Sequence, residues 1–184
     1  MSPPDSLIDT FRGLIAQYDI KLEINPKVYE LHSPVAVDVE HDEAGGLVGI
    51  GAYDGQRAYY WTTSHVGGWI LTADLIAHNG VTDFECLRQW GINVQDIQLI
   101  WDTMLLGHCL DSSLRSYGLK DMATRELGII YPSYDDIVGK KTKKQSHVRV
   151  TLDKQPIELV ALYNCMDCVV TYKLYEKQKA ACNV

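Results

Sequence analysis

Three consecutive β-strands are predicted from residues 35–62, which read VAVDVEHDEAGGLVGIGAYDGQRAYYWT. In the first six residues, valines alternate with other side chains, and this period of two places the valines on one face of a strand. Residues 47–53 and 57–62 form two further apolar runs, and the Asp54-Gly55 pair between them is typical of a tight hairpin turn. The three runs together predict an antiparallel meander.

Short apolar runs alternate with helical patterns in the part of the chain that follows. Residues 75–77 and 99–101 predict two more strands, and Asn79 is placed to cap a helix that continues to Trp90 and stops at Gly91. Further helices are predicted over residues 103–110, 119–127 and 156–179. A meander followed by β-α-β-α units predicts an α/β fold, in which a mixed sheet is covered by helices.

The two remaining segments are less regular. Residues 6–18 carry apolar side chains at helical spacing, which predicts a short helix with Ser6 as its N-cap. The polar stretch from there to Pro34 has no clear pattern. Residues 138–150 have no period and are rich in lysine, which predicts a loop.

The composition excludes several classes of protein. The chain of 184 residues has 46% hydrophobic and 22% charged residues, which is typical of one globular domain. Its 24 acidic and 17 basic residues argue against a protein that coats nucleic acid by bulk attraction. No membrane span or signal peptide is recognisable, and the five scattered cysteines do not form a disulfide framework. We therefore expect a cytoplasmic protein in a reducing compartment.

Several carboxylates fall in pairs with meaningful spacing. Asp38 and Glu40 project from the same face of a predicted strand, where they form either an exposed polar face or a cation site. Asp83 lies four residues after Asn79, and helix capping alone would explain that pair. Asp167 lies among apolar residues of the last helix, where an acid must be paired or act as a ligand.

The order of these pairs resembles a known family. Asp-x-Glu on a first strand, Asn-x-x-x-Asp after a later strand, and Tyr163-x-x-x-Asp167 on a C-terminal helix match the motifs of the DnaQ-like 3′-5′ exonucleases, which have an RNase H-like fold. The resemblance is strongest to the proofreading domain of bacterial and phage family A DNA polymerases, in the tyrosine (DEDDy) subclass. It covers residues 33 to 180 and implies an exonuclease domain over 33–184, preceded by an N-terminal extension over 1–32 with a short helix.

The resemblance also implies roles for individual residues. Two divalent cations, Mg²⁺ or Mn²⁺, would be held by Asp38, which bridges them, and by Glu40, Asp167 and Asp83, the last through water. Tyr163 would orient the attacking water. Substrate contacts are expected from Asn79, His41, Leu47, Lys140, Lys141, Lys143 and Lys144. The bulky residue that usually follows the first motif is replaced by Ala44-Gly45-Gly46, which leaves Leu47 as the candidate wedge against the terminal base.

The implied reaction is removal of nucleoside 5′-monophosphates from DNA 3′ ends, single-stranded or frayed, in proofreading, replication or repair. The sequence leaves two alternatives open. The same catalytic core could trim RNA, because the sequence does not reveal contacts with the 2′ position. A catalytically inactive binding domain is the other alternative, although all the acids and Tyr163 are present. A separate DNA polymerase is an expected partner, since the chain carries no polymerase domain of its own.

Overall fold

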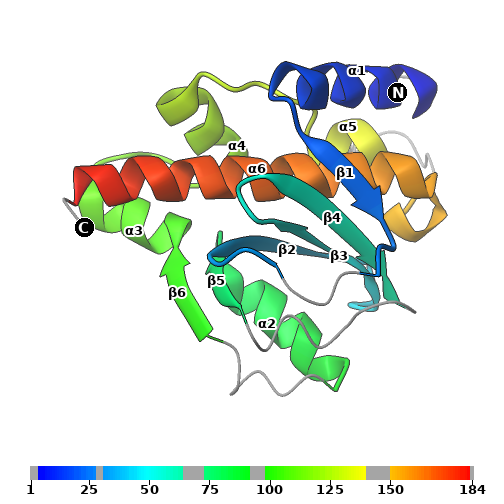
Figure 1. Cartoon of the computed structure of the whole chain (residues 1–184), viewed down its shortest axis with the longest axis horizontal. Coiled ribbons are helices and arrows are strands. Elements are labelled where there is room, and N and C mark those ends of the chain that lie inside the picture. The colour runs from blue at the N-terminus through cyan, green and yellow to red at the C-terminus, as the bar shows by residue number, and fades with distance from the viewer. Residues whose placement is uncertain (1–3, 28–30, 64–72, 92–97, 140–149, 183–184) are drawn as a thin grey trace, which may run out of the picture.

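The computed structural model describes residues 4–27, 31–63, 73–91, 98–139 and 150–182. Its described strands form one mixed sheet in the order β1-β4-β3-β2-β5-β6 (Figure 1). The strands are β1 (Lys21–Ile24), β2 (Val35–His41), β3 (Leu47–Tyr53), β4 (Arg57–Thr62), β5 (Asp74–Ala77) and β6 (Gln98–Asp102). The fold is the RNase H-like α/β arrangement that the sequence predicts.

The predicted meander is confirmed. Strands β2, β3 and β4 pair antiparallel, whereas β5 pairs parallel with β2 and β6 parallel with β5. The sequence analysis missed β1, which pairs parallel with β4 at the other edge of the sheet. Residues 21–24 (KLEI) alternate polar and apolar side chains over only four positions and are partly exposed, so the run is too short to mark a strand against the unpatterned stretch around it.

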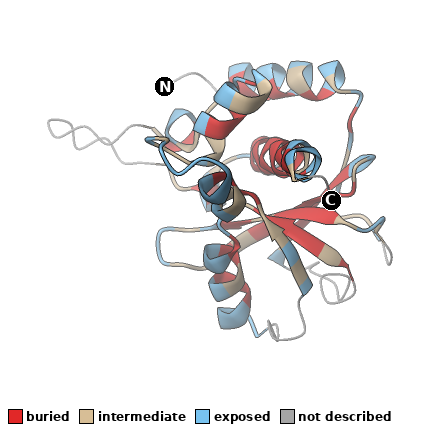
Figure 2. Cartoon of the chain, turned by 90° about the vertical axis from the view of Figure 1, so that its left-hand side faces the viewer, coloured by how far each residue is buried: buried red, intermediate tan, exposed pale blue. Residues whose placement is uncertain are grey.

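A long helix lies across one face of this sheet, and a shorter one covers the other face (Figure 1). The described helices are α1 (Pro4–Gln17), α2 (Gly80–Gln89), α3 (Thr103–Leu110), α4 (Leu119–Met122), α5 (Tyr134–Val138) and α6 (Ile157–Ala181), with a π-helical turn over Ala123–Leu127 and a 3₁₀ turn over Leu152–Lys154. Figure 2 shows α6 nearly end-on and buried, between the sheet and the helices on its far side. None of the described helices is both long and apolar enough to cross a bilayer.

Burial of α6 explains how polar side chains reach the interior. Every residue from Leu159 to Thr171 is buried, because the sheet covers one side of the helix and α1 covers another. Phe11 of α1 is fully buried, and its ring meets that of Tyr163 edge-on at 6.2 Å between centroids. Polar residues on this part of α6 must therefore find partners inside the protein.

The structure differs from several local predictions, and it adds one helix. Helix α1 begins at Pro4, so Ser6 lies inside it and is not its N-cap; proline is favoured in a first turn because its missing N–H would be unpaired there. The helix predicted over 119–127 changes from α to π geometry after Met122. The short helix α5 was not predicted. The lysine-rich positions 140–149 lie outside the described residues.

Candidate active site

Two acids of β2 face α6. Alternation along the strand puts Asp38 and Glu40 on one face, and puts Val37 and Val39 into a core cluster on the other. Glu40 is buried and Asp38 half-buried. The predicted shared face is therefore the one that the long C-terminal helix covers.

Asp167 of α6 completes a three-carboxylate cluster. Oxygens of Asp38, Glu40 and Asp167 all lie within 4.8 Å of one another. Asp167 is buried, and it is separated from the two β2 acids by more than 120 residues of sequence. Three buried carboxylates at this separation repel one another unless a cation lies between them.

Burial and nearby negative charge make the two acids of β2 hard to ionise. Burial, then the charges of Glu40 and Asp167, raises the pKa of Asp38 well above its usual value. Burial and the charge of Asp167 raise the pKa of Glu40 to about 7, although a hydrogen bond from Asn164 lowers it. The cluster therefore favours either protons or a positively charged ligand at neutral pH.

Asn164 fixes the geometry of both β2 acids. Its side-chain amide donates to Oδ2 of Asp38 at 2.7 Å, to the Asp38 carbonyl at 3.2 Å and to Oε1 of Glu40 at 3.3 Å. The side chain is fully buried. Sequence reasoning missed this residue because its partners come from the distant strand β2, and its position next to Tyr163 is the one signal available.

Two glycines of β3 make room for this arrangement. In the strand register, Gly51 lies opposite Asp38 and Gly49 opposite Glu40. A Cβ on Gly51 would lie 1.5 Å from Oδ1 of Asn164, and a Cβ on Gly49 would lie 2.2 Å from the Tyr60 hydroxyl oxygen. Any larger side chain at either position would displace groups that contact the acids.

A lysine that sequence reasoning did not assign neutralises part of the cluster. Lys120 of α4 donates to Oδ1 of Asp167, and the Tyr131 hydroxyl donates to the same oxygen at 2.6 Å. The Lys120 ammonium lies 3.5 Å from the ring centroid of Tyr131 and 4.5 Å from that of Tyr163. Burial lowers the pKa of Lys120 despite the attraction of Asp167. The sequence hint of this contact was a charged side chain, Lys120, between the apolar residues Leu119 and Met122 of the predicted helix.

Tyr163 and Asp83 interact electrostatically with acids of the cluster, and they lie on different helices. Tyr163 is buried on α6, and burial followed by the charge of Asp167 raises the pKa of its hydroxyl well above the usual value. Asp83 is buried on α2, and Figure 1 shows this helix on the opposite face of the sheet from α6. Burial, then the charge of Asp38, raises the pKa of Asp83. Asp83 is thus within electrostatic reach of the cluster without belonging to the three-carboxylate set.

Asn79 does not cap α2 through its side chain. It occupies the N-cap position with φ 63°, and its side-chain amide donates to Oγ1 of Thr82 instead. Asp102 supplies the cap, since its carboxylate accepts from the backbone N–H of Asn79 at 3.2 Å and of Gly80 at 2.9 Å. The same carboxylate caps α3, accepting from the backbone N–H of Met104 and Leu105. One acid therefore joins the starts of two helices.

A cavity of 570 Å³ opens beside Glu40. Its walls are residues 41–45, from the turn between β2 and β3, and Tyr134 at the start of α5. His41 is exposed in this wall, and its Nδ1 lies 3.1 Å from the Asp42 carbonyl. Leu47 is buried in the core cluster behind the turn, and its contact with a terminal base stays a prediction. Lys140, Lys141, Lys143 and Lys144 lie outside the described part of the chain.

Comparison of the sequence with protein families gives one match. A family model described as 3′-5′ exonuclease, of the DNA polymerase A type, matches residues 69–180, more than half of the chain. The matched stretch contains Asp83, Tyr163 and Asp167 but begins after β2, so Asp38 and Glu40 lie outside it. A search among curated proteins found no match.

Solved structures with the same fold are nucleases and a polymerase. The nuclease NrnC of Brucella melitensis, bound to pGG, superposes with a TM-score of 0.61 at 15% identity, covering 88% of this chain and 80% of that one. RNase D of Escherichia coli, an exoribonuclease involved in structured RNA processing, gives 0.52 at 16% identity, with 84% and 46% covered. Pol1 of M. smegmatis, in complex with DNA primer-template and dNTP, gives 0.50 at 14% identity, with 80% and 24% covered.

Proposed function

This chain belongs to the 3′-5′ exonuclease family, and on that premise we propose that it removes nucleoside 5′-monophosphates one at a time from the 3′ ends of DNA, single-stranded or frayed. The observation that carries the proposal is the convergence of Asp38, Glu40 and Asp167, whose carboxylate oxygens lie within 4.8 Å of one another. The three acids come from the first and third motifs, Asp38 and Glu40 on a strand and Asp167 on a helix, and they lie together in the structure. The proposal includes the tyrosine subclass, which the position of Tyr163 four residues before Asp167 supports.

The donor set fits two divalent cations. All the candidate ligands are carboxylate oxygens, which suit Mg²⁺ or Mn²⁺ better than zinc. Burial, followed by the charges of neighbouring acids, raises the pKa values of Asp38 and Glu40, so a cation would favour their ionised forms. Asp38, Glu40 and Asp167 would hold the ions, and Asp83 would act through bound water. When bound, such a pair activates the attacking water and stabilises charge on the leaving 3′ oxygen.

Tyr163 has the properties of a positioning group. Burial and the neighbouring acids keep its hydroxyl protonated at neutral pH, so it donates or accepts a hydrogen bond and does not remove a proton as a base. Its hydroxyl would orient the attacking water against the phosphorus. Lys120 lies beside the Tyr163 ring and contacts Asp167, so it would adjust its position when cations bind.

The cavity beside Glu40 is the proposed entry for the 3′ end. Tyr134, which lines the cavity together with the small residues Ala44 and Gly45, offers an aromatic surface on which a terminal base could stack. Residues 41–45 bring two acids to the wall, so a phosphate strand needs nearby cations. The lysines over 140–144 follow two residues after α5 ends, and we propose that they contact the strand.

RNA trimming is the second candidate. The observation in its favour is the likeness of the fold to NrnC bound to pGG and to the exoribonuclease RNase D. The same acids and Tyr163 would have the same roles on RNA. Proofreading beside a separate polymerase stays a prediction from the sequence.

The test is a gel assay with matched 5′-labelled DNA and RNA oligonucleotides. Each is incubated with Mg²⁺, with Mn²⁺ or with EDTA, beside the Asp38→Ala variant. We expect a ladder of one-nucleotide steps on DNA that requires both the metal and Asp38. A ladder on RNA alone would establish the second candidate. No ladder on either substrate, from folded protein with metal present, would refute the proposed activity.

A further inference from the structure

A second cavity, of 350 Å³, lies away from the three-carboxylate cluster, between the end of α3, the π-helical turn and the last turns of α6. Its floor is apolar and includes Leu114, Met122 and Leu174. Gly107 allows the close packing of this floor, because a Cβ there would lie 2.7 Å from Cε of Met122. A hollow of this size with an apolar floor is typical of sites for small molecules.

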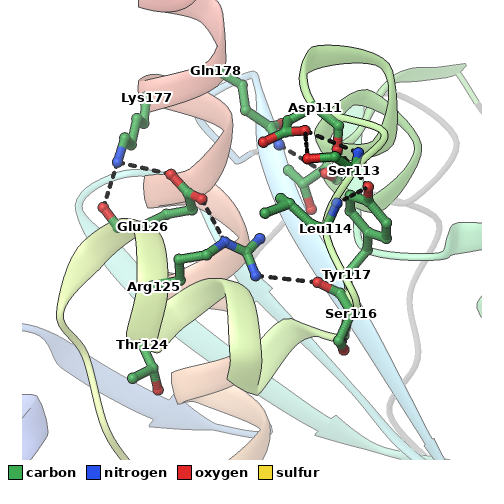
Figure 3. Close-up of polar contacts among 12 residues, drawn as sticks. Asp111, Ser113, Leu114, Ser116, Tyr117, Thr124, Arg125, Glu126, Lys177 and Gln178 are labelled. Carbon is green, nitrogen blue, oxygen red and sulfur yellow. Dashed lines mark hydrogen bonds and ion pairs between the residues drawn. The ribbon is translucent and has the colours of Figure 1, made fainter.

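The charges around the cavity balance. Glu126 pairs with Arg125 at 2.8 Å and with Lys177 at 3.0 Å, and Arg125 also donates through Nη1 to the Ser116 carbonyl at 3.1 Å. Asp111 lies on the other side (Figure 3). Two acids and two bases therefore surround an apolar floor, and this arrangement favours a ligand whose inserted part is neutral.

Two polar atoms at the rim remain available. Asp111 accepts both hydrogen bonds from Ser113 through Oδ1, so its Oδ2 has no partner among the described residues. Arg125 uses Nε and Nη1, and its Nη2 likewise has none within the described part of the chain. Figure 3 shows the two groups on either side of the Leu114 side chain. The cavity thus offers one acceptor and one donor across an apolar floor.

The free acceptor of Asp111 and the free donor of Arg125 suit a neutral planar ring that carries N–H groups beside a carbonyl. A nucleobase has that form. Guanine fits best, because its N2–H and N1–H can both point at the free Oδ2 of Asp111, while the adjacent O6 accepts from Nη2 of Arg125. The other bases offer a carboxylate fewer adjacent N–H groups. We propose that this cavity binds a guanine base, supplied either by a free guanine nucleotide or by a nucleic-acid strand.

The test follows the Met122 methyl group by NMR in protein labelled at its methionine methyl groups. GMP, AMP, CMP and UMP are titrated separately, in EDTA, so that no catalysis is involved. We expect GMP to shift the Met122 signal at concentrations at least tenfold below those of the other nucleotides. The proposal is overturned if neither a nucleotide nor a guanine-containing oligonucleotide shifts the signal, or if all four nucleotides shift it equally.

Two variants test whether the Met122 shift arises from GMP binding in this cavity. Asp111→Asn keeps an Oδ1 acceptor for Ser113 but replaces the free acceptor by a donor, so it should weaken GMP binding at least tenfold. Leu114→Trp should fill the hollow and abolish the shift. Asp153→Asn, at an exposed acid on the 3₁₀ turn, is the matched control and should leave binding unchanged. Unaltered GMP binding in folded Asp111→Asn would contradict the proposal.

A second set of titrations distinguishes a free guanine nucleotide from a guanine in a nucleic-acid strand. Oligonucleotides with and without guanine are added to Asp38→Ala protein in EDTA. A Met122 shift with GMP alone assigns the site to a free nucleotide, and a shift only with guanine-containing strands assigns it to the substrate strand. Because neither arm requires turnover, failure of the exonuclease assay would leave this result intact, and the reverse also holds.

Discussion

The side-chain amide of Asn164 donates a hydrogen bond of 2.7 Å to Oδ2 of Asp38, across 126 positions of sequence. It also reaches Glu40, so one buried amide holds both acids of β2 in place. It does so before any cation binds, and it lowers the pKa of Glu40 against the effect of burial. The geometry of the acid cluster therefore depends on an uncharged residue.

Replacing Asn164 by alanine should weaken both the fold and cation binding. Loss of the amide leaves buried acceptors unpaired, which costs about 1–3 kcal/mol in the free energy of unfolding. It also removes a group that lowers the pKa of Glu40, so Mg²⁺ binding should require a higher pH than in the wild type. Urea unfolding and Mg²⁺ titration at pH 6.5 and 8 measure the two effects. Gln56→Ala, in an exposed turn, is the control, and equal behaviour of the two variants would argue against this role.

Gly51→Ala should destabilise the protein by roughly 3 kcal/mol or more. The added Cβ would lie 1.5 Å from Oδ1 of Asn164, a distance that forces the buried side chain or the strand to move. Thermal unfolding with and without Mg²⁺ measures the loss. Gly118→Ala is the matched control, because its nearest atom would be 3.7 Å away and its φ of −60° suits alanine. Similar melting temperatures for both variants would show that the close approach of Asn164 is unimportant.

Lys120→Met should make the protein more dependent on divalent cations. Lys120 is the ammonium that contacts Asp167 in the cluster, so without it the carboxylates repel one another more strongly. We expect a lower melting temperature in EDTA and a larger increase on addition of Mg²⁺ than in the wild type. Lys154→Met, at an exposed lysine, should change neither value. If the melting temperature of Lys120→Met responded to Mg²⁺ as that of the wild type does, Lys120 would not take the place of a cation beside Asp167.

The elements that local pattern specifies were predicted, and those that distant contacts specify were not. The meander and the helix after Pro156 follow from periodicity and turn chemistry, so they were found. Strand β1 pairs with the edge of the sheet that β4 offers, and the four-residue alternation of residues 21–24 is too short to predict that pairing. The cap of α2 comes from Asp102, 23 residues after Asn79, because the chain returns to the same edge of the sheet.

The same division applies to the site. Motif order was enough to select Asp38, Glu40 and Asp167, and the structure brings these three together. Lys120 and Asn164 carry no such motif in isolation, and their roles appear only when α4 and α6 meet the sheet. Charged or amide side chains within apolar segments were the overlooked signal, since burial obliges them to find partners.

The stability of the metal-free protein should fall as the pH rises through the range 4.5 to 7. Glu40 has its pKa raised to about 7 in the folded protein, from 4.5 when exposed, so the folded state binds a proton that the unfolded state has lost. Unfolding then becomes easier by up to about 1.4 kcal/mol for each pH unit within that window. Melting curves in EDTA from pH 4.5 to 8 measure the slope.

Addition of Mg²⁺ is the control for this effect, because a cation stabilises the ionised carboxylates and its binding displaces the proton. The stabilisation by Mg²⁺ should therefore grow as the pH rises to about 7 and then level off. Glu40→Gln should flatten the slope in EDTA, since the glutamine has no proton to lose. A slope of the same size in that variant would assign the effect to another group.

Tyr163→Phe should slow the reaction less than Asp38→Ala does. The tyrosine hydroxyl positions one water, and loss of such a contact costs about 1.4–2.8 kcal/mol in the barrier, or roughly 10- to 100-fold in rate. Asp38→Ala removes a ligand shared by both cations, which should cost on the order of 4 kcal/mol, about a thousandfold. Single-turnover rates at saturating Mg²⁺ compare the two, and the Mg²⁺ affinity of Tyr163→Phe should equal that of the wild type. Tyr18→Phe controls for loss of a hydroxyl, because Tyr18 directly follows α1 and its ring contacts Lys173. If Tyr163→Phe lost as much activity as Asp38→Ala, or lost Mg²⁺ binding, the hydroxyl would have to act on the cations themselves and not on the water.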